Sequence, residues 1–87
     1  MTATLDILYF AWVREAVGKD SERIDHPGPD ITVADLVDRL AGRGPGHAAA
    51  LAEPKRLRAA LDQNFVPFSA PIGEAREMAL FPPVTGG

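Results

Sequence analysis

The group with the most distinctive chemistry in this sequence is the carboxylate of Gly87, which follows Gly86 at the end of the chain. Neither residue has a side chain, so the pair packs nothing and costs much backbone entropy to order. Such an end does little for a fold, but it can enter a narrow channel and present a bare carboxylate to another protein. An ionised carboxylate is a poor acyl donor, so we expect this one to need activation before it reacts.

A stiff apolar lead precedes this end. Pro82 and Pro83 hold φ at about −65° and lack amide donors, so neither a strand nor a helix continues through them. We therefore expect a folded domain over residues 1–81 and a flexible tail over residues 82–87. A frayed terminus would explain a Gly-Gly end alone. The apolar lead favours a delivery arm instead.

Three stretches resemble one protein family. The end Phe81-Pro82-Pro83-Val84-Thr85-Gly86-Gly87 resembles the tail of molybdopterin synthase small subunits, the MoaD-type sulfur carriers of the MoaD/ThiS superfamily of ubiquitin-like proteins. Residues 9–19 and the stretch Ala60–Val66 are similar to the same family, whereas residues 73–77 lack its usual acidic-glycine turn. The resemblance implies an α+β fold of the β-grasp (ubiquitin-like) type. It would have a mixed sheet of four to five strands with one main helix packed across it.

The same resemblance implies a reaction sequence. An ATP-dependent, E1-like adenylating enzyme would activate Gly87, and a sulfur donor protein would convert the acyl-adenylate into a thiocarboxylate. The tail would then enter the large subunit of molybdopterin synthase, within a heterotetramer, and give its sulfur to the pyranopterin precursor of the molybdenum cofactor. The large subunit would supply the catalytic side chains. This chain would be a non-catalytic, sulfur-donating subunit that binds no cofactor or metal, with ATP used by the activating enzyme.

The predicted partner-binding surface consists of the tail, an apolar patch beside it and one interface charge. The predicted residues are Phe68, Phe81, Pro82, Pro83, Val84, Thr85, Gly86 and Arg14. An apolar patch next to a delivery arm is typical of a docking site. Core packing is the alternative role for the two phenylalanines.

Two other functions remain open from the sequence. The sulfur carrier of thiamine-thiazole synthesis also ends in Gly-Gly, although the Phe-Pro-Pro-Val lead argues against it. The chain could instead be a ubiquitin-like modifier conjugated to lysines, or an interaction module with an inert tail. An activated glycine would serve conjugation as well as sulfur transfer.

Composition limits the remaining possibilities. The 87 residues suffice for one domain, and a net charge of −3 gives no reason to expect a nucleic acid. The densest basic run, Lys55-Arg56-Leu57-Arg58, is interpreted as a solvated face. No apolar run could span a membrane and the start lacks a secretory pattern, so we expect a cytoplasmic protein.

Side-chain chemistry is sparse. Cysteine is absent, which excludes a thiolate metal site and a cysteine nucleophile. Any carried sulfur must therefore sit on the terminal carboxyl carbon. No catalytic triad pattern or phosphate-binding loop is present, and His26 is expected to be an unpartnered surface histidine.

Residue patterns predict the elements that position the tail. Strands are expected at residues 5–10, 21–25, 57–61, 65–66 and 77–81, and short helices at 11–17 and 47–52. The main helix should begin after Thr32, with Asp35 completing a capping box, and end at Gly42. Its apolar stripe consists of Val33, Leu36, Val37 and Leu40.

Overall fold

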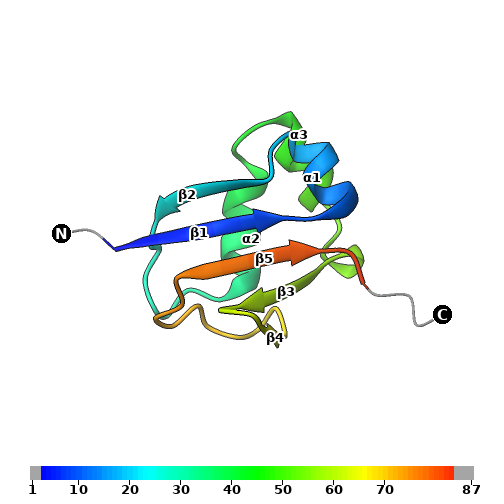
Figure 1. Cartoon of the computed structure of the whole chain (residues 1–87). Helices are drawn as coiled ribbons and strands as arrows, with labels where there is room; N and C mark the ends of the chain where they lie inside the picture. Colours follow the sequence, from blue (N-terminus) through cyan, green and yellow to red (C-terminus); the bar gives the residue numbers. More distant parts are fainter. Residues whose placement is uncertain (1–2, 84–87) are drawn as a thin grey trace.

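A computed structural model describes residues 3–83, while residues 1–2 and 84–87 lie outside the description. Along the chain the elements are β1 (Thr4–Tyr9), α1 (Ala11–Val17), β2 (Ser21–Asp25), α2 (Val33–Ala41), α3 (Pro45–Leu51), the 3-10 helix η1 (Pro54–Arg56), β3 (Arg58–Leu61), β4 (Asn64–Val66) and β5 (Glu77–Phe81) (Figure 1). Every predicted strand and helix is therefore present, with ends that shift by a few residues at most. Within the described part of the chain, no helix is long and apolar enough to cross a membrane.

The strands form one five-stranded mixed sheet in the order β2-β1-β5-β3-β4. The first and last strands, β1 and β5, lie side by side and run parallel, whereas the other neighbours are antiparallel. Helix α2 crosses one face of the sheet, and α1 packs with α3 beyond the end of β1 (Figure 1). This confirms the predicted mixed sheet with one main helix across it.

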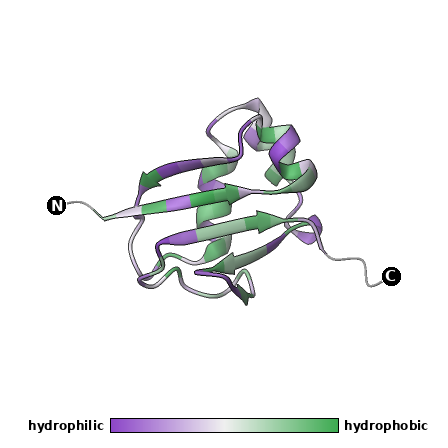
Figure 2. Cartoon of the chain, viewed as in Figure 1, coloured by the Kyte–Doolittle hydropathy of each residue, from purple (hydrophilic) through white to green (hydrophobic). Residues whose placement is uncertain are grey.

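The core lies between the sheet and α2. Along β1, Leu5, Ile7 and Tyr9 are buried, because alternate residues of a strand point to one face. Helix α2 buries the four predicted residues, Val33, Leu36, Val37 and Leu40. In Figure 2, β1 is accordingly mainly hydrophobic, whereas the edge strand β2 is mainly hydrophilic.

The start of α2 has the predicted capping box. The Thr32 hydroxyl accepts a hydrogen bond from the backbone N–H of Asp35 at 3.1 Å, and the Asp35 carboxylate accepts one from the backbone N–H of Thr32 at 3.5 Å. These bonds satisfy two donors that a helix start otherwise leaves free, and such caps contribute about 1 kcal/mol. The cap fixes where the apolar stripe of α2 meets the sheet.

A tight hairpin joins β3 and β4. Asp62 and Gln63 have φ of 48° and 71°, the left-handed values that a two-residue turn between antiparallel strands needs. The Asp62 carboxylate also accepts hydrogen bonds from the backbone N–H groups of Arg76 at 3.0 Å and Glu77 at 3.1 Å. The side chain of the turn thereby holds the start of β5, next to the 73–77 segment that departs from the family pattern.

Candidate functional site

The last strand brings the chain to one end of the sheet. Phe81, the final residue of β5, lies opposite Arg58 of β3. On the other side, the backbone N–H of Phe10 donates to the Leu80 carbonyl at 3.2 Å, so the connection from β1 to α1 borders the same place. The chain therefore leaves the sheet between the start of β3 and the start of α1.

An exposed aromatic pair marks this end. The ring centroids of Phe65 and Phe81 are 5.4 Å apart at an interplanar angle of 41°. Phe65 is 78% exposed, whereas Phe81 is half-buried. Because Leu80 is fully buried under α2, its neighbour Phe81 points to the opposite face of the sheet, where α2 does not reach. A large exposed aromatic beside the tail is typical of a docking surface.

A shallow hollow adjoins this pair, with a volume of about 390 Å³. It is lined by Arg58, Ala59, Phe65, Val66, Pro67 and Phe81. The walls are therefore apolar except for one guanidinium. We call this cavity the tail-side hollow.

Only some of the predicted site residues lie at the tail-side hollow. Phe81 lines the tail-side hollow, and Pro82 and Pro83 follow it half-buried. Phe68 packs against the core and does not line the hollow, so the structure does not bring it together with Phe81. Arg14 is exposed on α1, with its Nε 3.7 Å from an Asp20 carboxylate oxygen. Val84, Thr85, Gly86 and Gly87 lie outside the described residues.

Sequence reasoning missed Phe65 and Arg58. A signal existed, because a two-residue turn at Asp62-Gln63 places Asn64 opposite Leu61 and hence Phe65 opposite Ala60. The sequence interpretation instead included Asn64 in the turn, which left the register of the hairpin open. Without that register, neither the face on which Phe65 lies nor its contact with Phe81 can be deduced.

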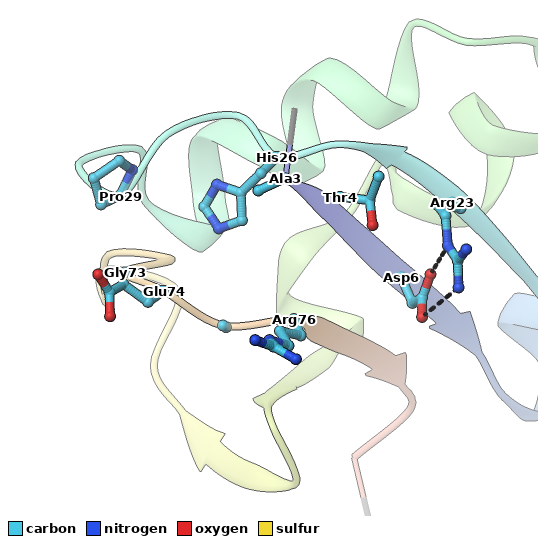
Figure 3. A pocket seen from close by; sticks show the side chains of 10 residues that line it. Ala3, Thr4, Asp6, Arg23, His26, Pro29, Gly73, Glu74 and Arg76 are labelled. Carbon is cyan, nitrogen blue, oxygen red and sulfur yellow. Dashed lines mark hydrogen bonds and ion pairs between the residues drawn. The ribbon is translucent and has the colours of Figure 1, made fainter. Parts of the chain in front are cut away.

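A second hollow, of about 780 Å³, lies toward the opposite end of β5 (Figure 3). Its walls contain both acidic and basic side chains. Two of them, Arg23 and Asp6, form an ion pair with the Arg23 Nε 2.7 Å from an Asp6 carboxylate oxygen. His26 also lines it; the expectation of an unpartnered surface histidine is wrong, since the ring is partly buried and its Nδ1 accepts a hydrogen bond from the Gly28 N–H at 3.0 Å. The contact joins two residues of the loop that follows β2, a local hydrogen bond that sequence composition alone does not reveal.

A buried polar cluster lies between the sheet and α3, on the same face of the sheet as Ile7. Glu22 Oε2 accepts hydrogen bonds from the Tyr9 hydroxyl at 2.7 Å and from His47 Nε2 at 2.6 Å. Arg43 Nη2 lies 3.1 Å from the other oxygen as an ion pair, at an angle outside that of a hydrogen bond. The Glu22 side chain is only 7% exposed, so the cluster holds β1, β2 and α3 together rather than meeting a substrate. Among residues 3–83, no group of three or more acidic or histidine side chains is arranged to hold a metal ion.

Comparison with known proteins decides the family. The model of the ThiS family matches residues 7–87, which includes the whole predicted tail. The chain belongs to the ThiS family. It is 41% identical to the molybdopterin synthase sulfur carrier subunit of Escherichia coli K12 over 83 residues, which cover 95% of this chain and 99% of that protein.

Solved structures agree on the fold. The crystal structure of small archaeal modifier protein 1 (SAMP1) from Haloferax volcanii has a TM-score of 0.71 at 26% identity, covering 98% of this chain and 100% of that one. A ubiquitin from Caldiarchaeum subterraneum is only 12% identical, but it covers all of both chains with a TM-score of 0.60. The fold of this ThiS-family chain is therefore the predicted ubiquitin-like β-grasp.

Proposed function

We propose that this chain is the sulfur-carrier small subunit of a molybdopterin synthase. The identity of 41% to a protein of that name, over nearly the full length of both chains, carries the proposal. The family match through residue 87 supports it, because it includes the glycine that would react. The same relative favours this function over the thiamine-thiazole carrier that the sequence left open.

The chemistry takes place at the Gly87 carboxylate. An E1-like adenylating enzyme joins this carboxylate to the α-phosphate of ATP and releases pyrophosphate, so that AMP becomes a good leaving group. A sulfur donor protein then delivers sulfur at the oxidation level of sulfide, which attacks the carbonyl carbon and displaces AMP, so that a thiocarboxylate remains. When the sulfur passes to the pyranopterin precursor in the large subunit, water returns an oxygen to the carbonyl carbon and the carboxylate is regenerated.

The partners divide the work accordingly. This chain needs no bound cofactor or metal of its own, because the activating enzyme uses ATP and the large subunit supplies the catalytic side chains. The adenylating enzyme, the sulfur donor and the large subunit are its partners in the cytoplasm, while a nucleic acid and a membrane have no part in the reaction. The net charge of −3 supports the exclusion of nucleic acid.

Docking of the large subunit would use the end of the sheet where the chain leaves it. The tail, from Pro82 onward, would enter the partner, while the exposed Phe65 and its neighbour Phe81 would pack against the partner's surface. Aromatic side chains beside a hollow are frequent anchors of protein interfaces. Arg14 on α1 would add a charge at the rim of the same contact.

Removing Gly87 tests this function. We expect the shortened chain to melt at the same temperature as the parent, because β5 ends at Phe81 and the core lies before it. Formation of the acyl-adenylate and of the thiocarboxylate should both be abolished. Intact-mass measurement of the parent, purified from cells, should show a species in which one terminal oxygen is replaced by sulfur. Sulfur loading of the shortened chain would refute the proposal.

The similarity to a small archaeal modifier protein supports a second candidate, conjugation of Gly87 to lysines. The two functions differ in their products. A carrier releases its sulfur and regenerates a free carboxylate, whereas a modifier remains attached through an isopeptide bond. Digestion of the total cell protein should yield almost no lysines that bear the end of this chain if it is solely a carrier. Abundant conjugates, without recovery of a large subunit in a pull-down, would favour the modifier.

A further inference from the structure

A cluster of basic side chains borders the tail-side hollow. Lys55 and Arg56 belong to η1, Arg58 begins β3, and all three residues are exposed. Because Arg58 lies opposite Phe81, the cluster stands where β5 ends and the chain leaves the sheet. We call these three residues the basic rim. The sequence interpretation of this run as a solvated face does not explain its position.

The guanidinium groups of Arg56 and Arg58 are held in place by contacts within the chain, but the charges of the basic rim are not neutralised by carboxylates of the described residues. Within residues 3–83, no carboxylate lies within 4.0 Å of these three side chains. Arg58 Nη1 donates to the backbone carbonyls of Leu57 at 2.8 Å and Lys55 at 3.5 Å, which orients its guanidinium. The Arg56 guanidinium lies 4.7 Å from the centre of the Trp12 ring, as a cation–π contact. Elsewhere in residues 3–83, Arg14, Arg23 and Arg43 have carboxylate partners, whereas Arg39 and Arg76 have none but are not grouped with other basic residues beside the tail-side hollow.

The surroundings of the basic rim indicate what it binds. Among residues 3–83, Arg58 is the one charged residue that lines the tail-side hollow, and its neighbours there are Ala59, Phe65, Val66, Pro67 and Phe81. A guanidinium with free donors at the edge of an apolar hollow fits a carboxylate that is adjacent to an apolar side chain. A bare phosphate would leave the apolar wall uncovered, and the chain's net charge of −3 opposes a nucleic acid.

We infer that the basic rim and the tail-side hollow together recognise an acidic segment of the synthase large subunit. A carboxylate of that segment meets Arg58, and an adjacent apolar side chain enters the hollow, while Lys55 and Arg56 attract further acidic groups. This inference rests on the proposed function, because it assigns a chemistry to the surface of the large subunit around the tail's point of entry. It makes Arg58 a residue that determines which partner is accepted.

Association kinetics with the large subunit of the same organism test the inference. Opposite charges at an interface rim act mainly on the association rate, and salt screens them. We expect Arg58→Glu to slow association about tenfold at low salt. The difference should disappear at about 1 M salt, where the screening length falls to about 3 Å. Arg58→Met should have an intermediate effect, and Arg58→Lys should remain close to the parent.

Arg76→Glu is the matched control. Arg76 is exposed and immediately precedes β5, so it lies at the opposite end of that strand, by the second hollow (Figure 3). The Arg76→Glu substitution changes the net charge by the same amount as Arg58→Glu, and we expect it to slow association less than twofold. Equal slowing by Arg58→Glu and Arg76→Glu, or no slowing by either, would overturn this inference. The proposed function as a sulfur carrier would not be affected by that result. If the parent itself fails to bind the large subunit, the proposed function fails as well. Unchanged melting temperatures will show that each variant is folded.

Discussion

Among the described residues, the carboxylate of Glu22 has the largest number of side-chain partners, which are Tyr9, His47 and Arg43. Burial alone would raise the pKa of Glu22, but hydrogen bonds from His47 and Tyr9 and the nearby charge of Arg43 outweigh it and lower the pKa below the ordinary 4.5. Burial, together with the hydrogen bond to Glu22, raises the pKa of Tyr9 far above its usual range, so its hydroxyl remains a donor. One ionised carboxylate thus organises residues from four segments of the chain.

Replacing this carboxylate should change how stability depends on pH. A carboxyl group whose pKa is lowered in the folded state stabilises the protein above its unfolded pKa, and this contribution is lost as the pH falls through the folded value. We expect Glu22→Gln to lower the free energy of unfolding by about 1–3 kcal/mol at pH 7. The difference from the parent should shrink below pH 4.5.

Urea unfolding between pH 7 and pH 3 measures this effect. Glu53→Gln is the control, because Glu53 is an exposed residue and, within residues 3–83, forms no ion pair. Its free energy of unfolding should follow that of the parent at every pH. A constant difference between Glu22→Gln and the parent down to pH 3 would show that the ionised carboxylate is not the stabilising group.

At the scale of elements, the contact between α1 and α3 depends on one glycine. A Cβ placed on Gly46 would lie 2.6 Å from the carbonyl oxygen of Ala16 and 3.2 Å from that of Val17. The sequence pattern predicted that the short helix begins at His47. The helix begins instead at Pro45, because proline suits a first helical position and Gly46 lets the next turn approach α1.

A methyl group at this position should therefore separate the two helices. We expect Gly46→Ala to destabilise the protein by about 1–3 kcal/mol, despite the better helix propensity of alanine. For a domain of this size, each kcal/mol corresponds to a fall in melting temperature of about 4–8 °C. Thermal melting followed by circular dichroism measures the change. Gly42→Ala is the control, because its Cβ would meet nothing closer than 3.4 Å. Equal melting temperatures for both variants would refute the close-approach explanation.

At the scale of the whole molecule, the two faces of the sheet have different tasks. The face under α2 buries Leu80 and Met78 completely, whereas the opposite face carries the exposed Phe65. On that outer face, Leu8, Ala79, Ala60 and Phe65 lie next to one another across four strands. Small residues, Ala79 and Ala60, lie at the centre of this row, and at its β4 end the exposed Phe65 ring contacts the ring of Phe81 from the neighbouring row.

Truncation on each face should separate docking from stability. We expect Phe65→Ala to change the free energy of unfolding by less than about 0.5 kcal/mol but to weaken binding to the large subunit about tenfold or more. Leu80→Ala, on the covered face, should lower the free energy of unfolding by about 2–5 kcal/mol. Denaturant unfolding and isothermal titration calorimetry measure the two effects. Unchanged binding by Phe65→Ala would exclude the aromatic pair from the interface.

The sequence alone determined the features that depend on neighbouring residues. The stripe and capping box of α2, the alternation along β1 and the stop imposed by Pro82 and Pro83 all follow from residues within a few positions of one another. Local steric and hydrogen-bonding preferences act over this range, so patterns and caps were sufficient. The resemblance of residues 81–87 to a known tail was equally local, and it led to the family.

Only the tertiary structure decided which distant residues meet. The pairing of Ile7 with Met78, which places β5 in the centre of the sheet, depends on burying both strands at once rather than on either sequence. The same is true of the contact between the rings of Phe65 and Phe81. It is also true of the hydrogen bond between His47 and the Glu22 carboxylate, which is 25 residues away. These contacts are chosen by the packing of the whole chain, because no local pattern encodes the register between segments that fold against each other.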